Sequence, residues 1–142
     1  MLLGATRVVD VTYLLDTSIY SQPLKRRPLA GVIDRWKEVG DHRCAVSVFC
    51  ELEVLQGLEM AASARLHDLY RTVLQNRLSI IPFTATEAAV YARLQGAAAR
   101  AGTTRPVIDL CIAATAIAHS LTLVTLNTRD FSGIDGLTLE GW

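Results

Sequence analysis

The sequence predicts a single three-layer α/β/α domain with a mainly parallel central sheet of four to five strands. Short apolar runs rich in β-branched residues alternate along the chain with longer segments of helical periodicity. Strands that alternate with helices are joined by right-handed crossovers, which make the sheet parallel and cover both of its faces. The length of 142 residues suits one domain with a real core.

The first part of the chain alternates between strand and helix. Residues 11–16 (VTYLLD) form an apolar run closed by polar residues, which is typical of a buried strand. A helix is expected over 29–39, because apolar residues recur every three or four positions and Gly40 follows. Residues 43–48 (RCAVSV) are short and β-branched, so they predict a second strand, with a helix over 49–57 after it.

The middle of the chain predicts two helices around a third strand. Residues 61–76 place their apolar side chains on one helical face, and 78–81 form a short strand stopped by a proline. Thr84 and Glu87 have the spacing of a capping box, which predicts a helix that begins there and runs over 84–100.

The last part predicts one more helix and one or two strands. A proline opens the helix expected over 106–120, and the run LTLVT at 121–125 predicts the fourth strand. A fifth strand is expected at an edge, over 137–139. We see no internal repeat and no linker, so one domain over 1–142 is expected, with residues 1–10 as an N-terminal extension.

Composition indicates a cytoplasmic protein. No apolar run is long enough to span a bilayer, and Arg7 and Asp10 interrupt the segment where a signal peptide would be apolar. The three cysteines form neither an even set nor a CxxC pair, so we interpret them as small buried residues. The net charge of zero argues against a simple nucleic-acid binder, unless several acids lie in one metal site and leave the remaining surface positive.

Four or five oxygen-bearing side chains are expected at one edge of the sheet. Asp16 ends the first strand, and Glu53 lies in the first turns of the helix after the second strand. Asp109 lies in the first turn of the helix before the fourth strand, and Asn127 and Asp130 follow that strand. Functional groups of open α/β sheets collect beyond the carboxyl ends of the strands. Oxygen ligands at that edge would suit Mg²⁺ or Mn²⁺.

Each acid also has a simpler interpretation. Asp16 could cap a following helix, Glu53 could be a solvated helix residue, and Asp130 could belong to a turn. Asp109 could lie in the first turn only because the positive end of the helix dipole stabilises a carboxylate there. Asp109 is nevertheless the strongest single signal, because it interrupts the apolar run VIDLCIAA, where an unpaired carboxylate is expensive to bury.

Four segments together resemble a known family. They are YLLDTS, SVFCELEVLQG, PVIDLCIAATA and LVTLNTRDF, and in order and spacing they resemble the four motifs of PIN-domain ribonucleases. The resemblance spans roughly residues 13–131, and the VapC toxins of bacterial toxin–antitoxin pairs are the most similar branch. It implies a PIN-like fold and an Mg²⁺-dependent endoribonuclease, with Mn²⁺ as a substitute. A metal-activated water would hydrolyse RNA to 5′-phosphate and 3′-hydroxyl ends.

The resemblance also implies roles for individual residues. Asp16, Glu53 and Asp109 match the three metal-binding, catalytic acids of the family. Asn127 stands where the family often has a fourth aspartate, so it brings an amide oxygen but no charge to the metal. Asp130 would supply the missing acid from the next turn.

Two details of this site stay open in the sequence. Glu51 is the alternative to Glu53, since the two lie two residues apart and a helix turns them about 200° away from each other. Ser18 and Thr125 are expected to hydrogen-bond the carboxylates from a second layer around the metal.

Partners are less clearly indicated. The basic run Lys25, Arg26 and Arg27 is either a solvated loop or a contact for RNA phosphates or an acidic partner. The resemblance implies an RNA substrate, a homodimer, and a cognate VapB-like antitoxin that inserts a segment into the groove. Two alternatives remain: a PIN-domain nuclease of RNA processing outside any toxin–antitoxin pair, and a catalytically inert α/β binding module.

Overall fold

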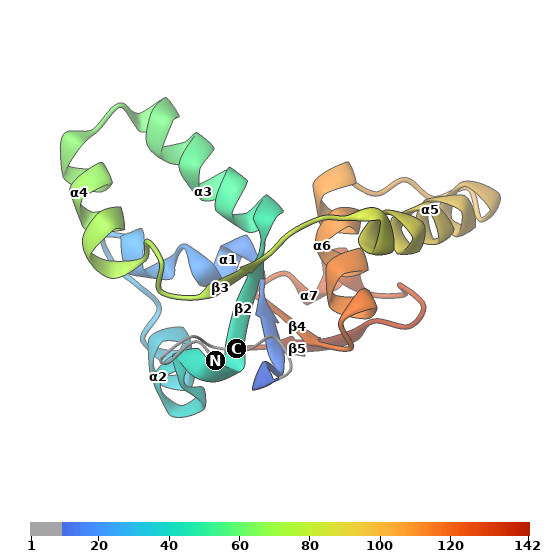
Figure 1. The fold of residues 1–142 in the computed structure, drawn as a ribbon, viewed down its shortest axis with the longest axis horizontal. Helices are drawn as coiled ribbons and strands as arrows, with labels where there is room; N and C mark the ends of the chain where they lie inside the picture. The colour runs from blue at the N-terminus through green and yellow to red at the C-terminus, as the bar shows by residue number, and fades with distance from the viewer. Residues whose placement is uncertain (1–9) are drawn as a thin grey trace.

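Five parallel strands form the centre of the computed structural model, which describes residues 10–142 (Figure 1). Their order in the sheet is β3-β2-β1-β4-β5, and every neighbouring pair is parallel. The strands are β1 (Tyr13–Leu15), β2 (Cys44–Ser47), β3 (Ser79–Ile81), β4 (Thr122–Thr125) and β5 (Thr138–Gly141). The predicted, mainly parallel sheet of four to five strands is therefore confirmed, with five strands that are all parallel. The predicted N-terminal extension, 1–10, lies outside the described residues except for Asp10.

Seven α-helices connect these strands within residues 10–142. They are α1 (Thr17–Tyr20), α2 (Ala30–Val39), α3 (Val48–Ala61), α4 (Ala64–Val73), α5 (Ala85–Arg100), α6 (Val107–Ala118) and α7 (Thr128–Phe131), with 3₁₀ turns η2 (Gln22–Leu24) and η3 (Asp41–Arg43). From β1 the chain moves through β2 to β3 at one edge, and it then returns to β4 and β5 on the other side of β1. Right-handed connections that run in opposite directions place their helices on opposite faces of the sheet.

This reversal of direction creates the place where a site forms. In open α/β sheets ligands bind beyond the carboxyl ends of the strands at the point where the strand order reverses. Here that point lies between β1 and β4, which are neighbours through the register Leu15 to Val124. The backbone N–H of Asp16 still donates to the carbonyl of Val124 at 2.8 Å, so the two strand ends stay together just where β1 stops.

Several boundaries differ from the prediction for local reasons. The predicted helix 49–57 continues to Ala61, because Gly57 is tolerated inside α3 and the helix ends only at Ala62, whose φ is +49°. The predicted helix 61–76 begins at Ala64 instead, where the Ser63 hydroxyl accepts from the N–H of Leu66 at 3.2 Å. The single-turn helices α1 and α7 were not predicted, since four residues are too few to show a helical period.

The capping box predicted from Thr84 and Glu87 is present at the start of α5. The Glu87 carboxylate accepts from the Thr84 N–H at 2.6 Å, and the Thr84 hydroxyl accepts from the Thr86 N–H at 3.3 Å. The three cysteines are free and buried, as predicted.

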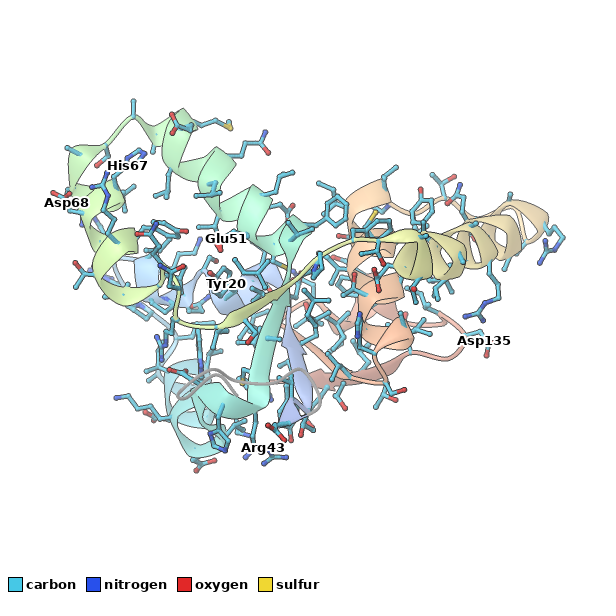
Figure 2. The ribbon with its side chains drawn as sticks, viewed as in Figure 1. Tyr20, Arg43, Glu51, His67, Asp68 and Asp135 are labelled. Atoms are coloured by element: carbon cyan, nitrogen blue, oxygen red, sulfur yellow. The ribbon has the colours of Figure 1, made fainter. Side chains whose placement is uncertain are left out.

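A buried carboxylate ties three helices together on one side of the sheet. Glu51 of α3 is only 7% exposed. Its Oε2 accepts from the hydroxyl of Tyr20 on α1 at 2.9 Å, and its Oε1 accepts from the hydroxyl of Tyr70 on α4 at 2.6 Å. Figure 2 shows Glu51 above Tyr20, between α3 and α1. Burial is the first cause that raises the pKa of both tyrosines, and the Glu51 carboxylate raises it further, to about 12 for Tyr70.

We predict that this network makes the protein sensitive to alkali. An unfolded tyrosine ionises near pH 10, whereas folded Tyr70 keeps its proton to about pH 12, so stability falls progressively as pH rises from about 10 to 12. Tyr70→Phe should cost about 1–3 kcal/mol at pH 8, because Glu51 loses a buried donor, and should also reduce the alkaline loss.

Urea unfolding between pH 8 and pH 12 measures both effects. Tyr91→Phe is the matched control, because this partly exposed tyrosine lies on α5, outside the network. An alkaline loss of stability that is the same in wild type and Tyr70→Phe would contradict the assignment.

Candidate active site at the carboxyl edge of the sheet

Asp16 lies at the switch point, directly after β1. It occupies the N-cap position of α1, but its side chain makes no capping hydrogen bond. Its Oδ2 instead accepts from the hydroxyls of Thr125 at 2.7 Å and Ser18 at 3.0 Å. These are the two hydrogen-bond partners expected from the sequence. Within residues 10–142 no group donates a hydrogen bond to Oδ1, so one oxygen of this buried carboxylate is held and the other is available to a ligand.

The same two hydroxyls hold the end of β4 against Asp16. The Ser18 hydroxyl accepts from the N–H of Leu126 at 3.0 Å, and the Thr125 hydroxyl accepts from the N–H of Asn127 at 3.0 Å. Each hydroxyl can therefore donate to the aspartate while it accepts from the backbone. This arrangement fixes both Asp16 and the start of the segment that carries Asn127.

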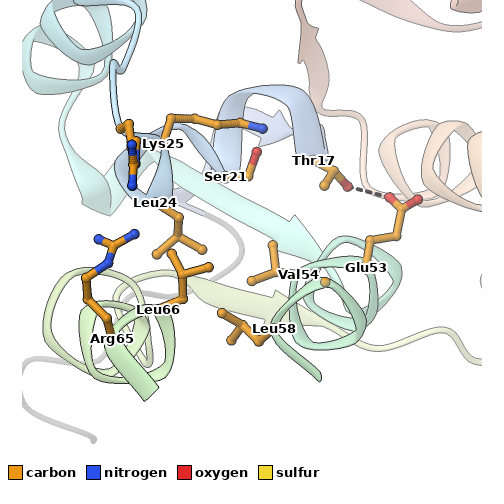
Figure 3. Close-up of a pocket in the computed structure, with 11 residues that line it drawn as sticks. Thr17, Ser21, Leu24, Lys25, Glu53, Val54, Leu58, Arg65 and Leu66 are labelled. Atoms are coloured by element: carbon orange, nitrogen blue, oxygen red, sulfur yellow. Dashed lines mark hydrogen bonds between the residues drawn. The ribbon is translucent and has the colours of Figure 1, made fainter. Parts of the chain in front are cut away.

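Glu53 and Glu51 of α3 meet opposite ends of α1: Glu53 lies at Thr17, beside Asp16, and Glu51 lies at Tyr20. The Glu53 Oε1 accepts from the hydroxyl of Thr17 at 2.5 Å (Figure 3). Glu51 is held in the tyrosine network on another side of the same helix. Because the groove beside Thr17 is lined by Glu53 and not by Glu51, the geometry favours Glu53 as the acid of the site.

Asp109 is half-buried at the start of α6, and no group of residues 10–142 donates a hydrogen bond to its carboxylate. Burial raises its pKa, and so do the nearby carboxylates of Asp16, Asp130 and Glu53, in that order. Arg105 lowers it. Charges on three different elements thus act on one carboxylate, which means that residues distant in sequence share one space.

The two remaining predicted residues lie on the outer side of that space. Asn127 is the N-cap of α7, and its exposed side chain makes no capping hydrogen bond. Asp130 lies on α7, is exposed, and is close enough to Asp109 to raise its pKa. Two further neighbours of these acids, Thr17 and Arg105, were not predicted, although each stands close in sequence to a predicted residue.

The donor atoms fit a hard divalent cation. Every side chain of the set offers oxygen, and four of the five are carboxylates that repel one another. A divalent charge would relieve that repulsion and stabilise the ionised form of Asp109. Within residues 10–142 no three His, Cys, Asp or Glu side chains are grouped closely enough to surround one ion by themselves. The set would therefore hold a metal together with water or substrate oxygens, as Mg²⁺ commonly requires.

A groove opens beside Glu53. Its volume is about 520 Å³, and α1, η2, α3 and α4 contribute its walls (Figure 3). Three cationic side chains border it, those of Lys25, Arg26 and Arg65. Apolar side chains lie between them: Leu24, Val54, Leu58 and Leu66. Two residues of the basic run predicted as a contact surface therefore border this groove, while exposed Arg27 is not part of its lining.

Comparison with known proteins places this geometry in a family. The PIN-domain profile matches residues 13–137, which is most of the chain and includes the four acids. The chain belongs to the PIN-domain family. The predicted resemblance and the predicted PIN-like fold are therefore confirmed. PIN-domain nucleases depend on divalent metal ions in general.

The similarity within the family is to toxins and VapC ribonucleases. Toxin FitB of Neisseria gonorrhoeae is 30% identical over 139 residues, covering 91% of this chain and 97% of that protein. The tRNA(fMet)-specific endonuclease VapC of Shigella flexneri is 30% identical over 132 residues, covering 92% and 97%. The crystal structure of DNA-bound VapBC from Salmonella typhimurium contains a chain that superposes with a TM-score of 0.82 at 26% identity, covering 93% and 98%. Among residues 10–142, no helix is both long and apolar enough to cross a membrane.

Proposed function

We propose that this chain is a metal-dependent endoribonuclease that acts as the toxin of a toxin–antitoxin pair. The observation that carries the proposal is the convergence of Asp16, Glu53 and Asp109 on one space at the switch point of a PIN-domain sheet. The relatives named as VapC ribonucleases and as a toxin support the same activity. We expect the protein to act in the cytoplasm, because its proposed substrate is RNA.

We assign the metal to Asp16, Glu53 and Asp109, with Asn127 and Asp130 completing the site on the outer side. Mg²⁺ is the proposed ion, with Mn²⁺ as a substitute, because all five side chains offer oxygen. A bound divalent ion would supply a Lewis acid and lower the pKa of a water molecule. The chain itself contributes the fixed acids: Thr125 and Ser18 orient Asp16, and Thr17 orients Glu53. Hydrolysis would leave 5′-phosphate and 3′-hydroxyl ends.

We predict that Asp109→Asn abolishes toxicity and RNA cleavage. The amide keeps the shape of the side chain but removes the charge, so cleavage should fall by more than the 10- to 100-fold loss typical of outer-layer changes at metal sites. Growth after induced expression and cleavage of a purified transfer RNA with Mg²⁺ or Mn²⁺ measure the two effects.

Substitution of each glutamate in turn tests which acid of α3 belongs to the site. Glu53→Gln should abolish cleavage, whereas Glu51→Gln should retain it once thermal melting shows a folded protein. The opposite result would move the site by two residues. Equal and negligible cleavage by wild type and Asp109→Asn would favour an inert binding module instead.

We propose that the basic and apolar groove takes a segment of the antitoxin. Lys25, Arg26 and Arg65 favour acidic side chains, and the leucines between them favour apolar ones. Structures similar to this chain include a toxin–antitoxin complex from Klebsiella pneumoniae. A segment bound there would reach Glu53, which lines the same groove, and so would block access to the metal site.

Charge reversal distinguishes this partner from RNA. Arg65→Glu with Arg26→Glu should weaken antitoxin binding at least about tenfold, since like charges oppose each other across the groove, and should leave RNA cleavage near wild type. Isothermal titration with the purified antitoxin and a cleavage assay measure the two effects separately. Loss of cleavage with unchanged antitoxin binding would assign the groove to RNA.

We propose that α3 also carries a homodimer interface. Val48, Leu52 and Leu55 follow one another at helical spacing and are 37%, 45% and 43% exposed. An apolar stripe of this kind is typical of an interface.

Light scattering tests the homodimer. We predict that Leu52→Glu with Leu55→Glu halves the mass in solution, because two buried like charges would oppose association. Leu29→Glu is the control, since Leu29 is 49% exposed at the start of α2 and not on the stripe. A wild-type mass equal to that of one chain would contradict the dimer.

A further inference from the structure

Arg105 lies in the loop before α6 and contacts the end of α7. Its Nη1 donates to the carbonyl of Asp130 at 2.8 Å, and its Nη2 donates to the carbonyl of Ser132 at 2.6 Å. Both carbonyls stand at the C-terminal end of α7, where backbone carbonyls lack partners inside the helix. One planar guanidinium therefore closes this helix end, and its rigid fork fixes the direction from which it approaches.

The helix that Arg105 holds is too short to be stable alone. Four residues form a single turn, far below the length at which an isolated helix persists in water. Phe131, only 2% exposed, anchors α7 in the core. Asn127 begins the helix and Asp130 lies on it, so the position of α7 decides where both side chains reach the site.

Arg105 also borders a cavity that it shares with two of the acids. This cavity has a volume of about 410 Å³, and Arg105, Asp109 and Asp130 are among the residues that line it. An arginine in this place has two opposite effects on a cation at the site. Its positive charge disfavours the cation, whereas its two hydrogen bonds hold the helix that brings ligands to it.

We propose that Arg105 is a positioning residue, which holds α7 so that Asn127 and Asp130 can join Asp109 in holding a divalent cation. The inference rests on the proposed metal-dependent function, and it concerns the outer half of the site, on α7. It predicts whether the removal of Arg105 raises or lowers the affinity of the site for the cation. If the charge of Arg105 dominated, its removal would strengthen cation binding; if its hydrogen bonds dominate, as we propose, its removal weakens binding.

Binding of Mn²⁺ to the full chain, without RNA, tests the direction of this change in affinity. The electron paramagnetic resonance signal of free Mn²⁺ gives the affinity directly. Arg105→Ala and Arg105→Lys should each weaken Mn²⁺ binding about tenfold, the size of effect expected when a supporting hydrogen bond around a metal ligand is lost. Lysine is informative because it keeps the charge but lacks the planar fork.

Arg129→Ala is the matched control. It removes a positive charge from α7 itself, at an exposed side chain, and leaves both carbonyl hydrogen bonds of Arg105 in place. Mn²⁺ should bind this variant as tightly as wild type or more tightly. In an Asp130→Asn background, Arg105→Ala should weaken binding less than it does in wild type, because part of its effect passes through Asp130.

Each outcome has a distinct meaning. Wild-type or tighter Mn²⁺ binding by Arg105→Ala, or wild-type binding by Arg105→Lys, overturns the positioning role while the metal site stands. No Mn²⁺ binding by wild type overturns the metal site and the positioning role together, before any variant is compared. Thermal melting shows which variants are folded. If Arg105→Ala does not fold, the Mn²⁺ affinity of the milder variant Arg105→Lys decides the test.

Discussion

Repulsion between like charges at the carboxyl edge of the sheet is the constraint on which the other features of the site depend. The chain brings the carboxylates of Asp16 after β1, Glu53 of α3 and Asp130 of α7 close enough to Asp109 of α6 to raise its pKa, in addition to the effect of burial. In an unfolded chain these carboxylates would repel one another and move apart in water. A parallel sheet holds them together, because its ladder fixes the strand ends and its reversal of direction between β1 and β4 opens a space just beyond them.

The supporting hydrogen bonds divide the oxygens of the site into two kinds. Thr125 and Ser18 hold one oxygen of Asp16, and Thr17 holds one oxygen of Glu53. The other oxygens accept no hydrogen bond from residues 10–142 and would be available to a cation. Arg105 supports the site indirectly, because it holds the backbone of α7 and not a carboxylate. Hydroxyls and backbone carbonyls thus provide rigidity, while the acids provide charge.

The tyrosine network shows why the identity of the α3 acid was open in the sequence. Two glutamates separated by two residues point to different sides of a helix, but periodicity does not say which side meets the active edge. Tyr20 and Tyr70, 50 residues apart in the chain, hold Glu51 buried between them, which favours Glu53 as the acid of the site. Once Glu51 is turned to that side, Glu53 is turned toward Thr17.

From the sequence alone one can predict the succession of strands and long helices along the chain, the capping box of α5, the family, and the hydroxyl partners of Asp16. These follow from local patterns: apolar periodicity, turn residues and motif spacing. Tertiary structure alone decided the single-turn helices α1 and α7, the groove beside Glu53, and the part played by Arg105. Each of these depends on contacts between segments far apart in the chain, such as Arg105 with Ser132 or Thr17 with Glu53, and no local pattern records such a contact.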